Sequence, residues 1–299
     1  MTVSFEIVGI FGTEPGGGSP LAVVHDAGGL STEQMRWIAG RLRADETVFV
    51  LPPATSGATY RVRVFTAAGE SPYGGHSAVG TAVSLVRRGD IRPGTVVQEC
   101  GGRQLTLRAG ADRAEFAATG TPRVESLPAD PVLDAIGLAA ADLAGEPVLA
   151  GFGPLFRMVP VRQEALGRAR PDFPAMTRHE LPEIFLFAWD GPAASAEARL
   201  FAPGWAIPRD PACASVALAF GAWLADRQGR PDAPRPFLIR QGAELGRPAL
   251  LSGTLGAGSG DAEITVTVGG PAPGELAGQI TASPPDASQP NVLRTSSAA

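Results

Sequence analysis

A strand, a loop rich in Gly and Pro, and a nearly uncharged helix occur in the same order in both halves of this chain. The first strand contains Arg63-Val64-Phe65-Thr66-Ala67, and the second contains Arg199-Leu200-Phe201-Ala202-Pro203. The helices that follow are expected over residues 77–86 and 215–224. Because a helix without a polar face is buried on all sides, each half should wrap a sheet around its own central helix. This internal repeat therefore predicts two halves that are built alike.

Each of these expected helices has a serine at its start, Ser77 in the first and Ser215 in the second. A serine at this position can cap free backbone N–H groups. The free amides and the helix dipole also attract anions. If the two helix starts face one cleft, that cleft suits a negatively charged ligand.

The length of 299 residues fits two domains of about 150 residues better than one. A hydrophobic content of 44% and a charged content of 18% are typical of a globular chain. We expect a first half over residues 1–120, a crossover with a short helix over 121–150 and a second half over 151–282. The C-terminal strand is a candidate to complete the first half. A tail of loop or disorder is expected over residues 283–299.

The N-terminal segment predicts a hairpin followed by a helix. Strands are expected over residues 3–11 and 21–24, on either side of the glycine run at 16–18. A dinucleotide-binding loop would open a helix after its glycines, so this run does not predict one. Ser31 and Gln34 form a capping box, which predicts an amphipathic helix over residues 31–43.

The chain contains no lysine, and this excludes several classes of enzyme. Pyridoxal-phosphate enzymes and Schiff-base aldolases need a lysine amine, and a P-loop needs a lysine to reach the phosphates. The formal charge of −5 and the pI near 5.3 provide no basic surface for nucleic acid. We expect no nucleic-acid partner.

Cysteine and histidine do not occur in metal-binding patterns. Cys100 and Cys213 are too few for a disulfide scaffold, and His25, His76 and His179 lie far apart without an H-E-x-x-H motif. The longest apolar stretch, residues 216–225, is about half a membrane span. No secretion signal is visible. We therefore expect a cytoplasmic protein with no metal, no cofactor and no membrane partner.

Five short stretches carry a more specific signature. They are Gly18-Ser19-Pro20-Leu21-Ala22-Val23; Asp45-Glu46-Thr47-Val48-Phe49-Val50; Arg63-Val64-Phe65-Thr66 with Glu70 and Pro72-Tyr73-Gly74-Gly75-His76; Arg199-Leu200-Phe201-Ala202-Pro203 through Asp210-Pro211-Ala212-Cys213-Ala214-Ser215; and Gln241-Gly242 with Gly246-Arg247-Pro248. In this order they resemble the PhzF family of phenazine-biosynthesis isomerases, whose fold is shared with diaminopimelate epimerase and proline racemase. The resemblance covers residues 5 to about 270.

The resemblance implies an α+β fold of the diaminopimelate epimerase type. Each half would be a barrel-like, mostly antiparallel sheet around a central apolar helix, and the protein would form a homodimer. The implied function is a cofactor-independent isomerase in antibiotic or other secondary-metabolite biosynthesis, acting on a small unsaturated carboxylic acid. Glu46 matches the family's catalytic acid/base, and His76 and Asp210 match its other polar catalytic positions.

The residue types agree with this chemistry. A carboxyl group in a closed, mostly apolar cleft has its neutral form favoured, so it can hold a proton near pH 7 and pass it on. Glu46 would take a proton from one carbon and return it to another. Without the resemblance, Glu46 and Arg209 would be read as surface groups, His76 as a loop hydrogen-bond partner and Asp210 as a helix N-cap.

The presumed substrate-binding positions depart from the family pattern in three places. Ser77 replaces a Pro, Arg209 replaces a Glu, and Cys213-Ala214 replaces Thr-Gly. The guanidinium of Arg209 suits a carboxylate, which indicates a substrate with an additional acid group. The resemblance places the following residues at the substrate: Ser19, Gly75, Ser77, Arg209, Ala212, Cys213, Ala214 and Ser215.

Two alternative functions stay open. One is a C–C bond hydrolase of the same fold that acts on a ring-cleaved, carboxylated tyrosine-derived intermediate, and the other is a non-catalytic metabolite-binding protein. A racemase with paired thiols is not expected, because Gly74 falls where the first thiol would lie. Cys100 and Cys213 are expected to be small buried residues.

Overall fold

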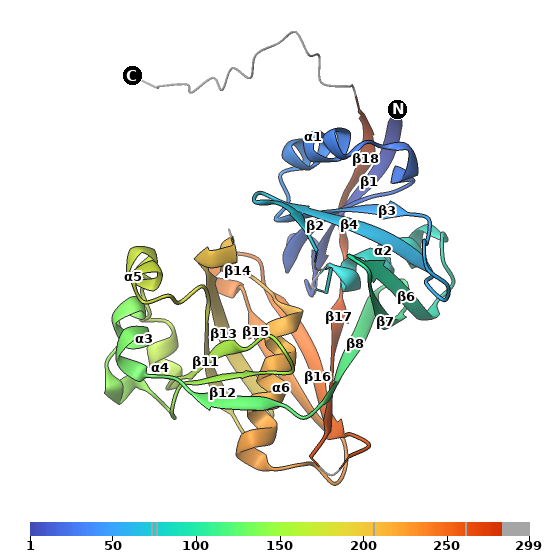
Figure 1. Ribbon diagram of the computed structural model, residues 1–299. Helices are drawn as coiled ribbons and strands as arrows, with labels where there is room; N and C mark the ends of the chain where they lie inside the picture. The colour runs from blue at the N-terminus through green and yellow to red at the C-terminus, as the bar shows by residue number, and fades with distance from the viewer. Residues whose placement is uncertain (73, 76, 206, 261, 283–299) are drawn as a thin grey trace, which may run out of the picture.

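The computed structural model describes residues 1–72, 74–75, 77–205, 207–260 and 262–282. The chain folds into two lobes (Figure 1). The elements of the first lobe are β1 (Thr2–Ile10), β2 (Ser19–Val24), η1 (Ala27–Gly29), α1 (Thr32–Leu42), β3 (Glu46–Leu51), β4 (Tyr60–Thr66), β5 (Gly69–Ser71), α2 (Ala78–Arg88), β6 (Gly94–Cys100), β7 (Arg103–Ala109), β8 (Arg113–Gly120) and β18 (Gly274–Thr281).

The second lobe contains the strands that surround α6 and a group of short helices on one side (Figure 1). Its elements are β9 (Arg123–Ser126), α3 (Ala129–Ile136), η2 (Ala140–Asp142), β10 (Val148–Gly151), β11 (Phe156–Pro160), α4 (Gln163–Leu166), α5 (Phe173–Arg178), β12 (Ile184–Asp190), β13 (Ser195–Ala202), η3 (Pro203–Trp205), β14 (Ile207–Asp210), α6 (Ala214–Gln228), β15 (Arg235–Gln241), η4 (Ala243–Leu245), β16 (Ala249–Ala257) and β17 (Ile264–Pro271).

The strand pairing of the first lobe is repeated in the second. In the first lobe β2 pairs parallel with β3, β3 antiparallel with β4, and β4 parallel with β6. The corresponding pairs in the second lobe are β11 with β12, β12 with β13, and β13 with β15, in the same orientations. The two strands of the sequence repeat, β4 and β13, therefore hold the same place in each sheet. This confirms the predicted α+β fold with two similar halves.

The central helices are buried, as their uncharged sequences predict. Residues 78–86 of α2 are all buried, and so is most of α6. Glycine allows the closest approaches to the surrounding sheet. A Cβ on Gly80 would lie 2.8 Å from Leu21 Cδ2, and one on Gly221 would lie 2.4 Å from Val266 Cγ1. Each helix is thus packed tightly against the strands of its own lobe.

The chain passes between the lobes more than once. β8 of the first lobe pairs with β17 of the second, so one continuous sheet joins the lobes. β18 then returns to pair with β1, which places the end of the described chain beside its start (Figure 1). Residues 121–150 contribute β9 and β10, which pair with each other, and α3 between them.

The helix starts differ in part from the sequence predictions. The Ser31–Gln34 capping box is present and begins α1, which confirms that prediction. Ser77 precedes α2 but already has helical backbone angles and makes no capping hydrogen bond. The residue before α6 is Cys213 rather than Ser215, again without a side-chain cap. The predicted serine caps are therefore wrong. Among the described residues, no helix is long and apolar enough to cross a bilayer.

Candidate active site

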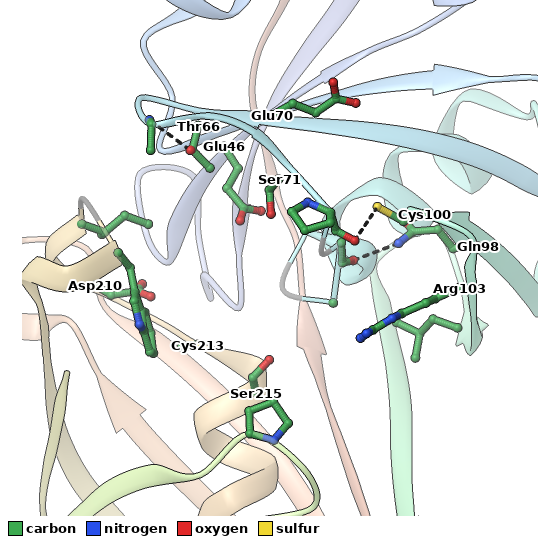
Figure 2. A pocket seen from close by; sticks show the side chains of 18 of the residues that line it. Glu46, Thr66, Glu70, Ser71, Gln98, Cys100, Arg103, Asp210, Cys213 and Ser215 are labelled. Atoms are coloured by element: carbon green, nitrogen blue, oxygen red, sulfur yellow. Dashed lines mark hydrogen bonds between the residues drawn. The ribbon is translucent and has the colours of Figure 1, made fainter. Parts of the chain in front are cut away.

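A pocket of about 770 Å³ lies between the lobes and is lined by residues from both (Figure 2). The first lobe contributes Glu46 at the start of β3, residues 66, 68–72, 74 and 75, and the end of the β6–β7 hairpin. The second lobe contributes Trp205 and Asp210, beside the start of α6. The volume falls within the range of about 300–1,000 Å³ that is common for small-molecule sites. It suits a metabolite rather than a polymer.

Glu46 projects into this pocket from the first lobe (Figure 2). Its Oε2 atom is inaccessible to water and has no hydrogen-bond partner among the described residues. Burial raises the pKa of Glu46 to about 7, while the nearby Ser77 hydroxyl lowers it and the charge of Asp45 raises it further. The Ser77 hydroxyl lies near the Glu46 carboxyl group without forming a well-oriented hydrogen bond to it, since Ser77 Oγ also has no hydrogen-bond partner among the described residues. The carboxyl group therefore exchanges its proton near neutral pH.

Asp210 ends β14 and enters the pocket from the second lobe. Its side chain is only 3% exposed, and its Oδ1 accepts a 3.0 Å hydrogen bond from the Ala212 backbone N–H. Gln241 Nε2 donates to the Asp210 carbonyl oxygen at 2.7 Å, which fixes the local backbone. Burial raises the pKa of Asp210 to about 8 despite the bond from Ala212, and the negative charges of Asp45 and Glu46 raise it further.

Glu46 and Asp210 are thus two carboxyl groups from different lobes that interact in one pocket. The pKa of Asp210 responds to the charge of Glu46, which places the two groups within electrostatic reach. Near pH 7, Asp210 is mostly protonated and Glu46 is divided between its two forms. One group can then accept a proton while the other donates a hydrogen bond or a proton. This arrangement suits general acid/base catalysis.

The starts of the two central helices meet at the pocket. A Cβ on Gly75, just before α2, would lie 3.9 Å from Ser215 Oγ in the first turn of α6. Both residues line the pocket. The first turn of α6 therefore lies at the pocket, where the positive end of the helix dipole favours an anionic ligand.

Both cysteines also line the pocket, and both are buried. Burial raises the pKa of Cys213, and the charge of Asp210 raises it further. Burial also raises the pKa of Cys100, to which the charge of Glu46 adds. Both side chains are therefore neutral thiols near pH 7 rather than thiolates. A Cβ on Gly74 would lie 3.0 Å from Cys100 Sγ. Gly74 is the position at which a racemase of this fold would carry its first thiol, and Cys100 already fills the space that such a side chain would need.

The other predicted site residues are distributed more widely. Ser19, Ser77, Ala212 and Ala214 are buried around the pocket elements but are not among the residues that line it. Arg209 is exposed and does not line the pocket, whereas the next residue, Asp210, is buried and lines it. His76 lies outside the described residues.

The sequence analysis missed one wall of the pocket. Gln98, Cys100, Arg103 and Leu105 line it together, all on the β6–β7 hairpin. The local signal for this hairpin is the pair Gly101-Gly102 between two alternating strands. Across the pocket, the second lobe contributes Phe156 and Trp205, which no sequence motif indicated. Among the described residues, no group of three or more His, Cys, Asp or Glu side chains is placed to hold a metal ion.

Comparison with known sequences places this geometry in a family. A sequence model of the phenazine biosynthesis-like proteins matches residues 8–278. An uncharacterized isomerase of Mesorhizobium japonicum is 32% identical over 273 residues, which cover 84% of this chain and 89% of the relative. Trans-2,3-dihydro-3-hydroxyanthranilate isomerase of Pseudomonas fluorescens is 30% identical over 256 residues, with 83% and 88% covered. These relatives confirm the prediction of an isomerase.

Solved structures confirm the fold. A phenazine biosynthesis protein of the PhzF family from Bacillus anthracis has a TM-score of 0.83 at 22% identity, covering 94% of this chain and 99% of that one. A hydroxyproline epimerase from Agrobacterium vitis has a TM-score of 0.60 at 16% identity, covering 95% and 94%. The epimerase-like architecture predicted from the sequence is thus shared with solved proteins.

Proposed function

We propose that this chain, which belongs to the phenazine biosynthesis-like protein family, is a cofactor-independent isomerase that moves a proton along a small unsaturated carboxylic acid. Glu46 carries the proton. The observation that supports this most directly is its carboxyl group, which points into the pocket, has a pKa of about 7 and has no hydrogen-bond partner for Oε2 among the described residues.

In the proposed reaction, the ionised form of Glu46 removes a proton from a carbon next to the double bond of the substrate. The negative charge spreads over the conjugated acid, and Glu46 returns the proton to a different carbon. Asp210, protonated near pH 7, donates a hydrogen bond to the substrate as charge develops. The backbone amides at the start of α6, beside Ser215, bind the substrate carboxylate.

His76, which lies outside the described residues, stays a candidate third catalytic group by family resemblance. A role in antibiotic or other secondary metabolism, a cytoplasmic location and a homodimer likewise stay predictions from the sequence. The relative from Pseudomonas fluorescens is named for its action on trans-2,3-dihydro-3-hydroxyanthranilate. That compound has the required carboxylate and unsaturation, so it is the first substrate to test.

The test is incubation of the protein with this compound, and with other unsaturated acids, in heavy water. Mass spectrometry should find a product of unchanged skeleton that carries one deuterium on carbon, because the Glu46 carboxyl group exchanges its proton with solvent deuterium before it protonates the second carbon. A shortened acid would instead identify the C–C hydrolase. Recovery of every compound unchanged and without deuterium would contradict catalysis and favour a binding protein. Activity should also persist after dialysis against a chelator.

A further inference from the structure

Ser77, at the start of α2, has a hydroxyl group that the helix itself does not use. The side chain is fully buried, and its Oγ has no hydrogen-bond partner among the described residues. A capping serine has extended backbone angles, whereas those of Ser77 are already helical, and no capping bond forms. Because a buried hydroxyl without a partner is unfavourable, its presence here needs a reason other than the packing of α2.

Glu46 presents the complementary atom. Its carboxyl group points into the pocket (Figure 2), while its Oε2 is shielded from water and also has no partner among the described residues. A serine hydroxyl can donate a hydrogen bond, and an ionised carboxylate can only accept one. Ser77 and Glu46 therefore supply one buried donor and one buried acceptor that are both unsatisfied.

The packing of α2 against the sheet places Ser77 toward Glu46. Leu21 is the direct neighbour of Glu46 in the parallel pair of β2 and β3, so their side chains lie on the same face of the sheet. α2 meets this face at Gly80, where an added Cβ would lie 2.8 Å from Leu21 Cδ2. Ser77 lies three residues before Gly80, on the same side of the helix and one turn nearer its start. The first turn of α2 therefore covers the strand face that carries Glu46.

The backbone at Ser77 is fixed by the helix that follows it. The Ser77 carbonyl oxygen accepts a 3.0 Å hydrogen bond from the Thr81 backbone N–H and a 2.9 Å bond from the Thr81 hydroxyl. Glu46 is held by its place in β3. Rotation of the two side chains is therefore enough to align the Ser77 hydroxyl with the carboxylate, and the backbone does not have to move.

Ionisable groups from both lobes surround Glu46. Within the described chain they are Asp45, Glu70, Cys100, Arg103, Asp210 and Cys213. Burial raises the pKa of Glu46, the Ser77 hydroxyl lowers it, and the charge of Asp45 raises it again. Burial also raises the pKa values of Asp210 and Cys213, and the charge of Glu46 adds to both. Ser77 therefore favours the ionised form of Glu46 against burial and against the acidic groups nearby.

We propose that Ser77 is a positioning residue whose hydroxyl donates a hydrogen bond to Glu46 Oε2 when the carboxyl group gives up its proton. The bond stabilises the carboxylate that removes the proton from the substrate and fixes its orientation. The Pro that the family pattern has at this position carries no hydroxyl, so the device belongs to this chain. Ser77, expected from the resemblance to contact the substrate, instead prepares the base. This assignment rests on the proposed function, because it names a residue that supports the proton transfer by Glu46.

The test follows the side-chain carboxyl carbon of Glu46 by NMR at a series of pH values, in protein labelled with ¹³C-glutamate. Glu46→Gln identifies the signal by its loss. In wild-type protein the signal should titrate near pH 7. In Ser77→Ala it should titrate about one pH unit higher, because a hydrogen bond to a charged group is lost. Ser77→Cys keeps a weaker donor and should titrate between the two.

Ser84→Ala is the matched control. Ser84 is a buried serine of the same helix, and its hydroxyl donates to Glu6 instead. In this variant the Glu46 signal should titrate as in wild-type protein. Because Ser77 does not line the pocket, Ser77→Ala should also leave the KM for trans-2,3-dihydro-3-hydroxyanthranilate nearly unchanged and lower the rate on the acidic side of the pH profile. A raised KM with an unchanged titration would assign Ser77 to the substrate and reject the proposal.

Titration at the same pH in Ser77→Ala and wild-type protein would overturn the proposal, and so would an equal shift in Ser84→Ala. Thermal unfolding shows whether each variant is folded. If Ser77→Ala does not fold, titration of Ser77→Cys at or below the wild-type pH decides against the proposal. Because the titration needs no turnover, it separates the two claims. A shift that depends on Ser77, in a protein that never transfers deuterium, would leave this assignment standing and reject the isomerase.

Discussion

Glu46 and Glu183 occupy equivalent places in the two lobes, but only Glu183 is held by an arginine. Thr47 pairs with Phe65, and Ile184 pairs with Phe201, on the strands that carry the sequence repeat. The residues before Thr47 and Ile184 are therefore counterparts. Glu183 accepts a hydrogen bond from Arg157 Nη1 at 3.0 Å and another from the Arg157 backbone N–H at 3.2 Å. Oε2 of Glu46 has no such partner in the described chain. The same position stabilises one lobe and provides a reactive carboxyl group in the other.

The two glutamates should respond to substitution with opposite signs. Burial raises the pKa of Glu183 as well, although Arg157 opposes this. Glu183→Gln nevertheless leaves the partly buried Arg157 without its charge partner, and this loss should dominate and lower the free energy of unfolding by about 1–3 kcal/mol. Glu46→Gln should raise it by about 1–3 kcal/mol at pH 8, because it removes a carboxylate that burial disfavours. Denaturant unfolding of both variants measures these values. Destabilisation by Glu46→Gln at pH 8 would contradict the assignment.

The increase in the free energy of unfolding that Glu46→Gln produces should depend on pH over a defined range. The pKa of Glu46 is raised from 4.5 to about 7 on folding, so the folded state keeps its proton while the unfolded state loses it. Wild-type stability contributed by this group therefore falls as pH rises from about 4.5 to about 7, and stays constant above that range. The difference between variant and wild type should grow over the same window. A difference that is equal at pH 4 and pH 8 would argue against a raised pKa.

The rate of proton transfer should give a narrow bell-shaped pH profile. The rate rises as Glu46 loses its proton near pH 7 and falls as Asp210 loses its proton near pH 8. Because the carboxyl groups of Glu46 and Asp210 interact, the apparent pKa values of the two limbs describe the pair rather than either residue alone. Asp210→Asn keeps a hydrogen-bond donor and cannot ionise, so the alkaline limb should disappear while the acidic limb stays. Initial rates between pH 5 and pH 10 decide this, and an unchanged alkaline limb would assign it to another group.

The packing of the central helices gives a prediction that is independent of the chemistry. Gly221→Ala places a Cβ 2.4 Å from Val266 Cγ1 inside a buried contact, where the stiff valine cannot move aside. The overpacking should outweigh the gain in helix propensity and lower the free energy of unfolding by about 1–3 kcal/mol. Adding Val266→Ala should recover part of the loss. If the two substitutions destabilise additively, the contact is not the cause.

The sequence predicted those features that depend on local patterns or on the repeat. The Ser31–Gln34 capping box marked the start of α1, and the uncharged helices marked the two cores. The motifs around Glu46 and Asp210 identified two residues from different lobes that the structure brings into one pocket. The capping box is encoded by neighbouring residues, the two cores were predicted from the repeated uncharged helices, and Glu46 and Asp210 were identified through the family resemblance of their motifs.

The sequence could not predict the features that depend on register and packing. Arg209 was chosen for its residue type, but the pairing of β14 with β13 is irregular here, and Arg209 is exposed while Asp210 is buried at the pocket. Arg103 lacked a motif, and its place follows from a glycine turn that pairs it with Cys100. Ser77 was expected to cap α2, but it already has helical backbone angles. Phe156 and Trp205 meet only after the second lobe has folded.

The central claim is that Glu46 carries the proton, and Glu46→Gln tests it most directly. Gln keeps the shape of the side chain but cannot exchange a proton, so deuterium transfer from heavy water to substrate carbon should fall by about 10²–10⁴-fold. Substrate binding should change little. Deuterium incorporation by Glu46→Gln at more than about a tenth of the wild-type rate would contradict the account, and Asp210 would become the next candidate.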